Sequence, residues 1–160
     1  GDKLRIGVIG AGNYAASMLI PHLRQDERVD LAHVVTSTGL NAAGIAKRFG
    51  IPTHGTDVAA LLSDKSIKAV TIATRHSSHA ALVAQALTAG LAVFVEKPLA
   101  LDEEGLSLIR RAMRPDSRLM VGFNRRFSPA LQRMAQLLRG CAPLHMIYRV
   151  QAGQLPPDAG

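Results

Sequence analysis

Short apolar runs alternate with segments of helical periodicity along almost the whole chain, and this alternation restricts the fold more than any other sequence feature. Apolar runs predict strands at 4–9, 29–35, 68–74, 91–95 and 119–122. Helical spacing and capping residues predict helices at 11–24, 41–49, 56–62, 79–88, 102–113 and 129–138. Strands and helices that alternate at these lengths predict a doubly wound α/β fold, a parallel sheet joined by right-handed crossovers.

The size and composition agree with a soluble, globular protein. A chain of 160 residues is long enough to bury more than half of the surface that it exposes when unfolded. Its residues are 48% hydrophobic, yet no apolar run is long enough to span a bilayer. Cys141 is the only cysteine, so no disulfide forms within the chain, and we expect a reducing, cytoplasmic location without a membrane partner.

A glycine turn follows the first predicted strand, in the segment Gly10-Ala11-Gly12-Asn13-Tyr14-Ala15. Gly10 permits a tight turn, Gly12 lets the backbone approach a pyrophosphate, and Ala15 lets the next helix pack closely. The amide groups at the start of that helix face the anion. The pattern G-x-G-x-x-A between a strand and a helix therefore predicts a site for the pyrophosphate of a dinucleotide.

Polar residues also follow the later strands. In a doubly wound sheet, ligands lie at the carboxyl ends of the strands, near the point where the strand order reverses. We expect five clusters to line one crevice: Gly10 to Gly12, Thr36 to Thr38, Thr74 to His76, Glu96 to Pro98, and Gly122 to Arg125.

The cluster after the second strand bears on the choice between NAD and NADP. NAD-binding turns usually carry an acidic residue about twenty positions after the glycines, where it reads the ribose hydroxyls. This chain has Thr36, Ser37 and Thr38 there. Without a carboxylate to repel a 2′-phosphate, NADP is slightly favoured over NAD. The alternative is that these hydroxyls only cap the helix that begins near Asn41. The missing acid also argues against an S-adenosylmethionine methyltransferase.

Lys97 follows a buried apolar strand, with Glu96 before it and Pro98 after it. A lysine at the mouth of a nicotinamide crevice can hydrogen-bond a substrate hydroxyl and favour the alkoxide character that develops as hydride leaves. Glu96 would orient this lysine or contact the nicotinamide ribose. The plainer alternative is an ion pair near the start of the next helix.

Two other classes of site are weaker expectations. The formal charge is +7, and eight arginines lie between Arg110 and Arg139. Aromatic residues make up only 4% of the chain, which argues against a nucleic-acid surface and for solvated helix faces or a surface that covers an acidic partner domain. His76 and His79 have no cysteine or carboxylate near them in sequence, so we expect no metal site.

Four segments, taken in order, complete the pattern: Gly10 to Ala15, Ile72 to His76 with His79, Val95 to Ala100, and Val121 to Phe127. Together they resemble the N-terminal cofactor domain of the Gfo/Idh/MocA oxidoreductases, over nearly the whole chain. The resemblance implies a Rossmann-type NAD(P)-binding domain at 1–141 and the start of a second, substrate-binding and dimerisation domain at 142–160.

The resemblance also implies roles for individual residues. Lys97 matches the catalytic lysine of the family, next to the substrate. The cofactor contacts that it implies are Asn13 and Tyr14 at the pyrophosphate and Thr74, Arg75, His76 and His79 around the ribose and nicotinamide, with Glu96 and Lys97 near them. Asn124 and Arg125 would lie on the substrate side, with Asn124 also near the cofactor. Family members usually have proline where Arg75 stands, so this loop is expected to differ.

The family resemblance implies a larger enzyme. The segments 122–127 and 147–153 look like the branch that is fused to a zinc alcohol dehydrogenase-like module. In the family a second domain supplies most of the substrate pocket and a partner for the lysine, and here only its first strand, Leu144 to Val150, is expected. We therefore expect this chain to bind cofactor without turning over a sugar, polyol or nucleotide sugar by itself. A homo-oligomer paired through that strand is possible, and a non-catalytic dinucleotide sensor is the alternative.

Overall fold

The computed structural model describes residues 3–147 and residue 149. The contacts divide the chain into two compact units, one that reaches to Phe123 and one that begins at Asn124. The predicted domain boundary between residues 141 and 142 rests on the family resemblance and stays a prediction.

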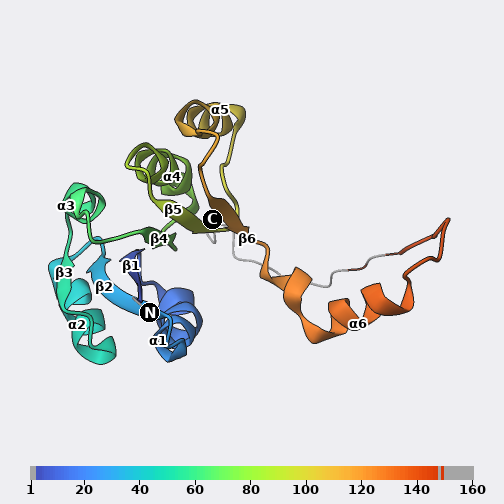
Figure 1. Ribbon diagram of the computed structural model, residues 1–160, viewed down its shortest axis with the longest axis horizontal. Helices are drawn as coiled ribbons and strands as arrows, with labels where there is room; N and C mark the ends of the chain where they lie inside the picture. The colour runs from blue at the N-terminus through green and yellow to red at the C-terminus, as the bar shows by residue number, and fades with distance from the viewer. Residues whose placement is uncertain (1–2, 148, 150–160) are drawn as a thin grey trace, which may run out of the picture. The chain divides into compact units, whose positions relative to one another are not determined.

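The first unit contains the predicted doubly wound sheet. Its six strands are all parallel and lie in the order β3-β2-β1-β4-β5-β6 (Figure 1). The strands are β1 (Leu4–Ile9), β2 (Val29–Val35), β3 (Thr53–Gly55), β4 (Ala69–Ile72), β5 (Ala92–Glu96) and β6 (Leu119–Gly122). The order reverses beside β1, because the chain first builds outward to β3 and then crosses back to β4.

Helices cover both faces of this sheet. In Figure 1, α1 (Ile20–Gln25) and α2 (Gly39–Phe49) lie on one side, and α3 (Val58–Ser63), α4 (His79–Thr88) and α5 (Glu103–Ala112) lie on the other. Each layer buries a separate core. On the first side, Val8 and Val34 from the sheet pack in one cluster with Ile20. On the other side, Ile72 and Val83 belong to a second cluster. Burial of one such side chain contributes about 1.5–3 kcal/mol.

Capping residues fix several helix ends. The side chain of Thr38 accepts a hydrogen bond from the Asn41 amide at the start of α2, and Gly50 ends this helix with a φ of 66°. Asp102 caps α5 as predicted, because its carboxylate accepts from the amide of Gly105 at 2.7 Å. The third helix begins later than predicted, at Val58, because the carboxylate of Asp57 takes the capping position.

The helix after the glycine turn differs from the prediction. Helical structure begins at Asn13, two residues after the predicted start, passes through a π-helical segment at Ala15–Leu19 and continues as α1 to Gln25, one residue beyond the predicted end. The amide of Ile20 donates to the carbonyl of Ala15, five residues back. Proline lacks an amide hydrogen, and Pro21 lies in the first turn of α1, just after this change of hydrogen-bond pattern.

Strand β3 was not expected from the sequence. Its three residues pair with the end of β2, from His33 with Thr53 to Val35 with Gly55. A strand this short has no periodicity to read, and Pro52 directly before it indicates a turn. Strand β3 is the outermost strand of the sheet. The turn after it therefore lies at the carboxyl ends of the strands, and this turn carries Thr56.

The second unit contains a short 3₁₀ turn at Asn124–Phe127 and the helix α6 (Pro129–Leu137), which the Ser128 hydroxyl caps. Residues 144–147 and 149 form no strand, whereas residues 148 and 150 lie outside the described residues. The strand predicted at 144–150 is therefore wrong where the structure describes the chain, because an extended segment needs a neighbouring strand for its backbone hydrogen bonds. Within residues 3–147 and 149, no helix is long and apolar enough to cross a membrane.

Candidate functional site

A cleft of about 740 Å³ lies at the carboxyl ends of β1, β2, β3 and β4. It therefore occupies the place where the strand order reverses, which is where doubly wound sheets bind ligands. Its lining consists mostly of small and hydroxyl side chains with the backbone of the glycine turn. These residues are Ile9, Gly10, Ala11, Gly12, Val35, Thr36, Ser37, Asn41, Thr56, Val58, Ala73, Thr74, Arg75, Ser77, Ser78 and Leu82.

The glycine turn lines the cleft, and its two glycines, Gly10 and Gly12, have different roles. Gly10 has a φ of 88°, and a Cβ atom there would lie 2.6 Å from the carbonyl oxygen of Ala73. The amide of Gly10 donates a hydrogen bond to the carbonyl of Val35, and the amide of Ala73 donates one to the carbonyl of Ile9. The turn is therefore fixed to β2 and to the end of β4. A Cβ atom on Gly12 would have no atom within 4 Å. Gly10 therefore shapes the turn, whereas Gly12 keeps its surface open to a ligand.

Three hydroxyl side chains follow β2, and they are not equivalent. Thr36 is buried, and its hydroxyl donates to the carbonyl of Thr38 at 2.8 Å. The hydroxyl of Thr38 accepts from the amide of Asn41 at 3.4 Å, so the capping alternative holds for this residue. Ser37 is exposed and lines the cleft, and its side chain makes no hydrogen bond with a described residue. Ser37 is thus the hydroxyl of this cluster that remains available to a ligand.

The turn after β4 is held by its own hydroxyl groups. The hydroxyls of Thr74 and Ser78 lie 2.6 Å apart, and the Ser78 hydroxyl donates to the carbonyl of Arg75 at 2.8 Å. The side chain of Ser78 therefore makes no capping hydrogen bond to α4, although serine at this position is a residue type that often caps helices. Thr74, Arg75, Ser77 and Ser78 all line the cleft.

The two histidines of this turn lie outside the cleft lining. His76 is exposed, and its ring contacts the ring of His79 edge-on, with centroids 5.7 Å apart. His79 is completely buried: its Nδ1 lies 2.7 Å from the carbonyl oxygen of Pro98, and its Nε2 lies 3.2 Å from that of Thr74. Within the described residues, no group of three or more His, Cys, Asp and Glu side chains gathers as metal ligands would.

Lys97 stands at the carboxyl end of β5, beside the cleft rather than in its lining. Ile9, Ile72 and Val95 are in register across β1, β4 and β5, so two strand spacings, about 10 Å, separate the glycine turn from the Lys97 turn. The side chain of Lys97 is exposed and makes no hydrogen bond or ion pair with a described residue. Its ammonium group is therefore available at this edge of the sheet.

Glu96 pairs with Gly122 across β5 and β6 and is partly buried. A Cβ atom on Gly122 would lie 2.9 Å from Glu96 Oε1, so the glycine leaves room for this carboxylate. Asn13 and Tyr14 are exposed at the start of the helix after the glycine turn. Asn124 and Arg125 belong to the second unit.

Some residues of the cleft were not expected from the sequence. They include Asn41 in the first turn of α2, Thr56 and Val58 beyond β3, and Leu82 on α4. Thr56 escaped prediction because the strand before it is only three residues long. The position of Leu82, one helical turn after Ser78, the residue before α4, is the signal that could have identified it.

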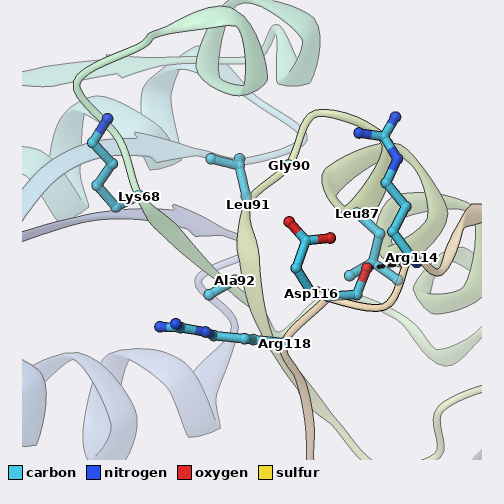
Figure 2. A pocket seen from close by; sticks show the side chains of 9 residues that line it. Lys68, Leu87, Gly90, Leu91, Ala92, Arg114, Asp116 and Arg118 are labelled. Carbon is cyan, nitrogen blue, oxygen red and sulfur yellow. Dashed lines mark hydrogen bonds between the residues drawn. The ribbon is translucent and has the colours of Figure 1, made fainter.

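A second, smaller cavity of about 250 Å³ lies at the opposite edge of the sheet, at the amino ends of β4, β5 and β6 (Figure 2). Lys68, Arg114, Arg118 and Asp116 are among its lining residues. In Figure 2 the charged ends of the three cations lie well apart from one another, and the Lys68 ammonium donates to the carbonyl of Lys65. These cations do not converge on one point, so this cavity offers no cradle for an anion.

One buried titratable group lies on the central strands. His33 on β2 is buried, and this burial lowers the pKa of its imidazole. The nearby His54 lowers the pKa further, whereas the carboxylate of Asp64 opposes the shift. The neutral form of His33 is thus the one that the fold favours.

Comparisons with known proteins agree with this geometry. The family model described as "Oxidoreductase family, NAD-binding Rossmann fold" (GFO_IDH_MocA) matches residues 4–123. A D-apiose dehydrogenase from Paraburkholderia graminis is 36% identical over 143 residues, which are 86% of this chain and 36% of that protein. A putative oxidoreductase, YceM, from Salmonella typhimurium is 34% identical over 144 residues, which are 89% of this chain and 46% of that protein.

A solved structure has the same fold. The 3-ketoreductase KijD10 from Actinomadura kijaniata, crystallised with NADP and TDP-benzene, aligns with a TM-score of 0.75 and 26% identity. The alignment covers 86% of this chain and 42% of that protein. The chain therefore spans less than half of the length of each of these relatives.

Proposed function

Because this chain belongs to the Gfo/Idh/MocA oxidoreductase family and carries its NAD-binding Rossmann fold, we propose that it is the cofactor-binding part of an NAD(P)-dependent dehydrogenase. The substrate class that we propose is a sugar, a polyol or a nucleotide sugar, in which a CH–OH group is oxidised. The dehydrogenase of D-apiose among its relatives supports this class. The observation that carries the proposal is the pair of glycines at the switch point of the sheet.

Gly10 and Gly12 fit a dinucleotide pyrophosphate for steric reasons. The positive φ of Gly10, which glycine adopts without strain, brings the turn against the end of β4, and the open surface at Gly12 admits a phosphate to the backbone. The helical segment that starts at Asn13 directs its first amides toward the same place. The hydroxyls of Ser37, Thr56 and Thr74 then offer hydrogen-bond partners around the cleft.

A bound nicotinamide dinucleotide supplies the hydride acceptor for the oxidation of an alcohol. The residue that acts on the alcohol in this proposal is Lys97. Its exposed ammonium group donates a hydrogen bond to the substrate hydroxyl oxygen and stabilises the negative charge that develops on it. Glu96 stands directly before it on β5 and orients this turn. Asn124 and Arg125 are proposed to contact the substrate.

The proposed cofactor preference is slightly toward NADP. The cluster at Thr36, Ser37 and Thr38 carries no carboxylate, and Ser37 has a hydroxyl group available to a 2′-phosphate. The relative KijD10 was crystallised with NADP, which is consistent with this preference. The fusion to a zinc alcohol dehydrogenase-like module remains a proposal from the family resemblance. The cytoplasmic location, which is inferred from the single cysteine, and a homo-oligomeric state also remain proposals.

Calorimetric titration of the chain with NADH and NADPH tests the cofactor proposal. We expect both to bind, NADPH somewhat more tightly, and we expect Lys97→Met to change either affinity by no more than about twofold. Lys68→Met at the opposite edge of the sheet is the matched control. If neither dinucleotide binds the unmodified chain, this chain does not form a complete cofactor site.

The catalytic proposal needs a separate measurement. In a longer protein that contains this chain, Lys97→Met should abolish turnover of its sugar or polyol while the dinucleotide affinity is retained. Intact Lys97 and Glu96 favour the enzyme over a non-catalytic dinucleotide sensor, which would be insensitive to this substitution. We also expect the isolated chain to be inactive, so steady formation of NADPH or NADH by it with any sugar or polyol would contradict that part of the proposal.

A further inference from the structure

His79 is a polar side chain in an apolar environment. It is the first residue of α4, none of its surface is exposed, and the completely buried Val83 follows it by one helical turn. A buried imidazole is costly unless its nitrogens have hydrogen-bond partners. Both of its nitrogens have one, and each partner is a backbone carbonyl of a different turn.

These two carbonyls belong to the two turns that matter for the proposed site. The Pro98 carbonyl, 2.7 Å from Nδ1, directly follows Lys97, and the Thr74 carbonyl, 3.2 Å from Nε2, belongs to a residue of the cleft lining. A carbonyl oxygen only accepts hydrogen bonds, and a neutral imidazole carries one N–H. Because the contact to Pro98 is shorter, we assign the donated bond to Nδ1.

The sheet itself does not fix these turns relative to each other. The β4–β5 pairing ends at Ile72 with Val95, so no ladder pairing joins the Thr74 turn directly to the Lys97 turn, although Glu96 still pairs with Gly122 of β6. The Thr74 turn has internal hydrogen bonds through Ser78. The side chain of His79 is therefore a bridge from that stiff turn to the one that carries Lys97.

We propose that His79 is a positioning residue, which holds the Lys97–Pro98 turn against the Thr74–Arg75 turn of the cleft by donating a hydrogen bond from Nδ1 to the Pro98 carbonyl, while Nε2 lies beside the Thr74 carbonyl. It touches neither substrate nor cofactor, because it is fully buried. This inference rests on the proposed function in one respect: the turn that His79 positions carries Lys97, which is proposed to act on the substrate. The positioning itself can be measured without any ligand.

Three substitutions separate positioning from mere packing. His79→Asn places an amide N–H near the position of Nδ1 and can restore the bond to Pro98, whereas His79→Gln places its N–H near that of Nε2. His79→Leu fills the space but leaves the Pro98 carbonyl without this donor. Val83→Ala is the matched control, because it removes buried volume from the same helix and leaves both turns bonded.

Nuclear magnetic resonance of the ligand-free chain is the first measurement. In the unmodified chain we expect a proton on Nδ1 of His79 that exchanges slowly with water. In His79→Leu and His79→Gln, the amide signals of residues 96–99 should shift or broaden, and in His79→Asn they should return toward their original positions. In Val83→Ala they should stay in place although thermal stability falls.

The affinity for NADPH is the second measurement. We expect it to weaken about tenfold in His79→Leu, as the loss of one hydrogen bond that holds a binding turn predicts, and to stay within about threefold in Val83→Ala. An Nδ1 without a proton, or signals of residues 96–99 that are unchanged in His79→Leu, would overturn the proposal. If His79→Leu does not fold, the unmodified ring spectrum and the contrast between Asn and Gln decide it. If the unmodified chain binds no dinucleotide, the proposed function is contradicted. The ligand-free spectra then test the positioning role of His79 on their own.

Discussion

Replacement of Gly10 by alanine should cost stability, whereas the same replacement at Gly12 should not. At Gly10 the backbone has a φ of 88°, which costs an L-residue about 1–2 kcal/mol. The new Cβ would also lie 2.6 Å from the Ala73 carbonyl oxygen and 2.7 Å from Thr74 Cγ2. The carbonyl is backbone and cannot rotate away, so overpacking adds about 1–3 kcal/mol.

The sum predicts that Gly10→Ala lowers the free energy of unfolding by about 2–5 kcal/mol, a large part of the stability of an ordinary domain. Unfolding in urea, followed by circular dichroism, measures this change. Because the turn is fixed to β2 and to the end of β4 through the Gly10 and Ala73 amides, the loss should affect the whole first unit in one transition.

Gly12→Ala is the control within the same turn. No atom lies within 4 Å of its added Cβ, so the free energy of unfolding should change by less than about 1 kcal/mol. Its methyl group would instead occupy the place that a pyrophosphate approaches, and we expect the affinity for NADH and NADPH to fall at least about tenfold. The reasoning is refuted if Gly10→Ala is as stable as the unmodified chain, or if Gly12→Ala binds the dinucleotides normally.

Three further predictions concern a cap, a buried histidine and the cofactor preference. Asp102→Ala removes the acceptor of the Gly105 amide and should lower the free energy of unfolding by about 1 kcal/mol in urea, whereas Asp102→Asn should lose less. The lowered pKa of His33 means that the unfolded chain takes up a proton more readily as the pH falls through about 6.5, so stability should be full above that pH and decrease below it. His33→Gln should reduce this decrease between about pH 7.5 and pH 5.5, and an unchanged slope would contradict the role of His33. Ser37→Asp puts a carboxylate at the cleft and should weaken NADPH relative to NADH at least about tenfold in calorimetric titrations, and an unchanged ratio would place the 2′-phosphate elsewhere.

The sequence was sufficient to predict the doubly wound sheet and most of its elements. Apolar runs gave the bounds of β2 and β6 as the structure has them, and Gly50 marked the end of α2. These predictions succeed because burial on both faces leaves continuous apolar strands and because a left-handed helix end favours glycine. Strand β3 and the π-helical segment were missed, because both depend on a few hydrogen bonds that leave no periodic pattern in the sequence.

The candidate site was predictable only as far as strand ends determine it. The turns after β1, β2 and β4 meet in one cleft, as their place at the carboxyl edge requires. The sequence could not predict which side chain of a turn bonds locally and which stays available to a ligand. Thr36 and Thr38 bond locally and leave Ser37 available, and His79 turns inward to two carbonyls. Such choices depend on side-chain directions that only the folded backbone sets.

The strand order has a consequence for how this chain could be re-engineered. Every residue that lines the cleft lies between Ile9 and Leu82, whereas the lysine proposed to act on substrate comes later, at position 97. The residues proposed for dinucleotide selectivity and the lysine proposed for alcohol chemistry thus lie in consecutive stretches of the polypeptide, not in interleaved ones. Exchange of the first stretch with that of a relative should transfer coenzyme preference as a block, provided that the incoming stretch carries a histidine at position 79, which joins the two stretches.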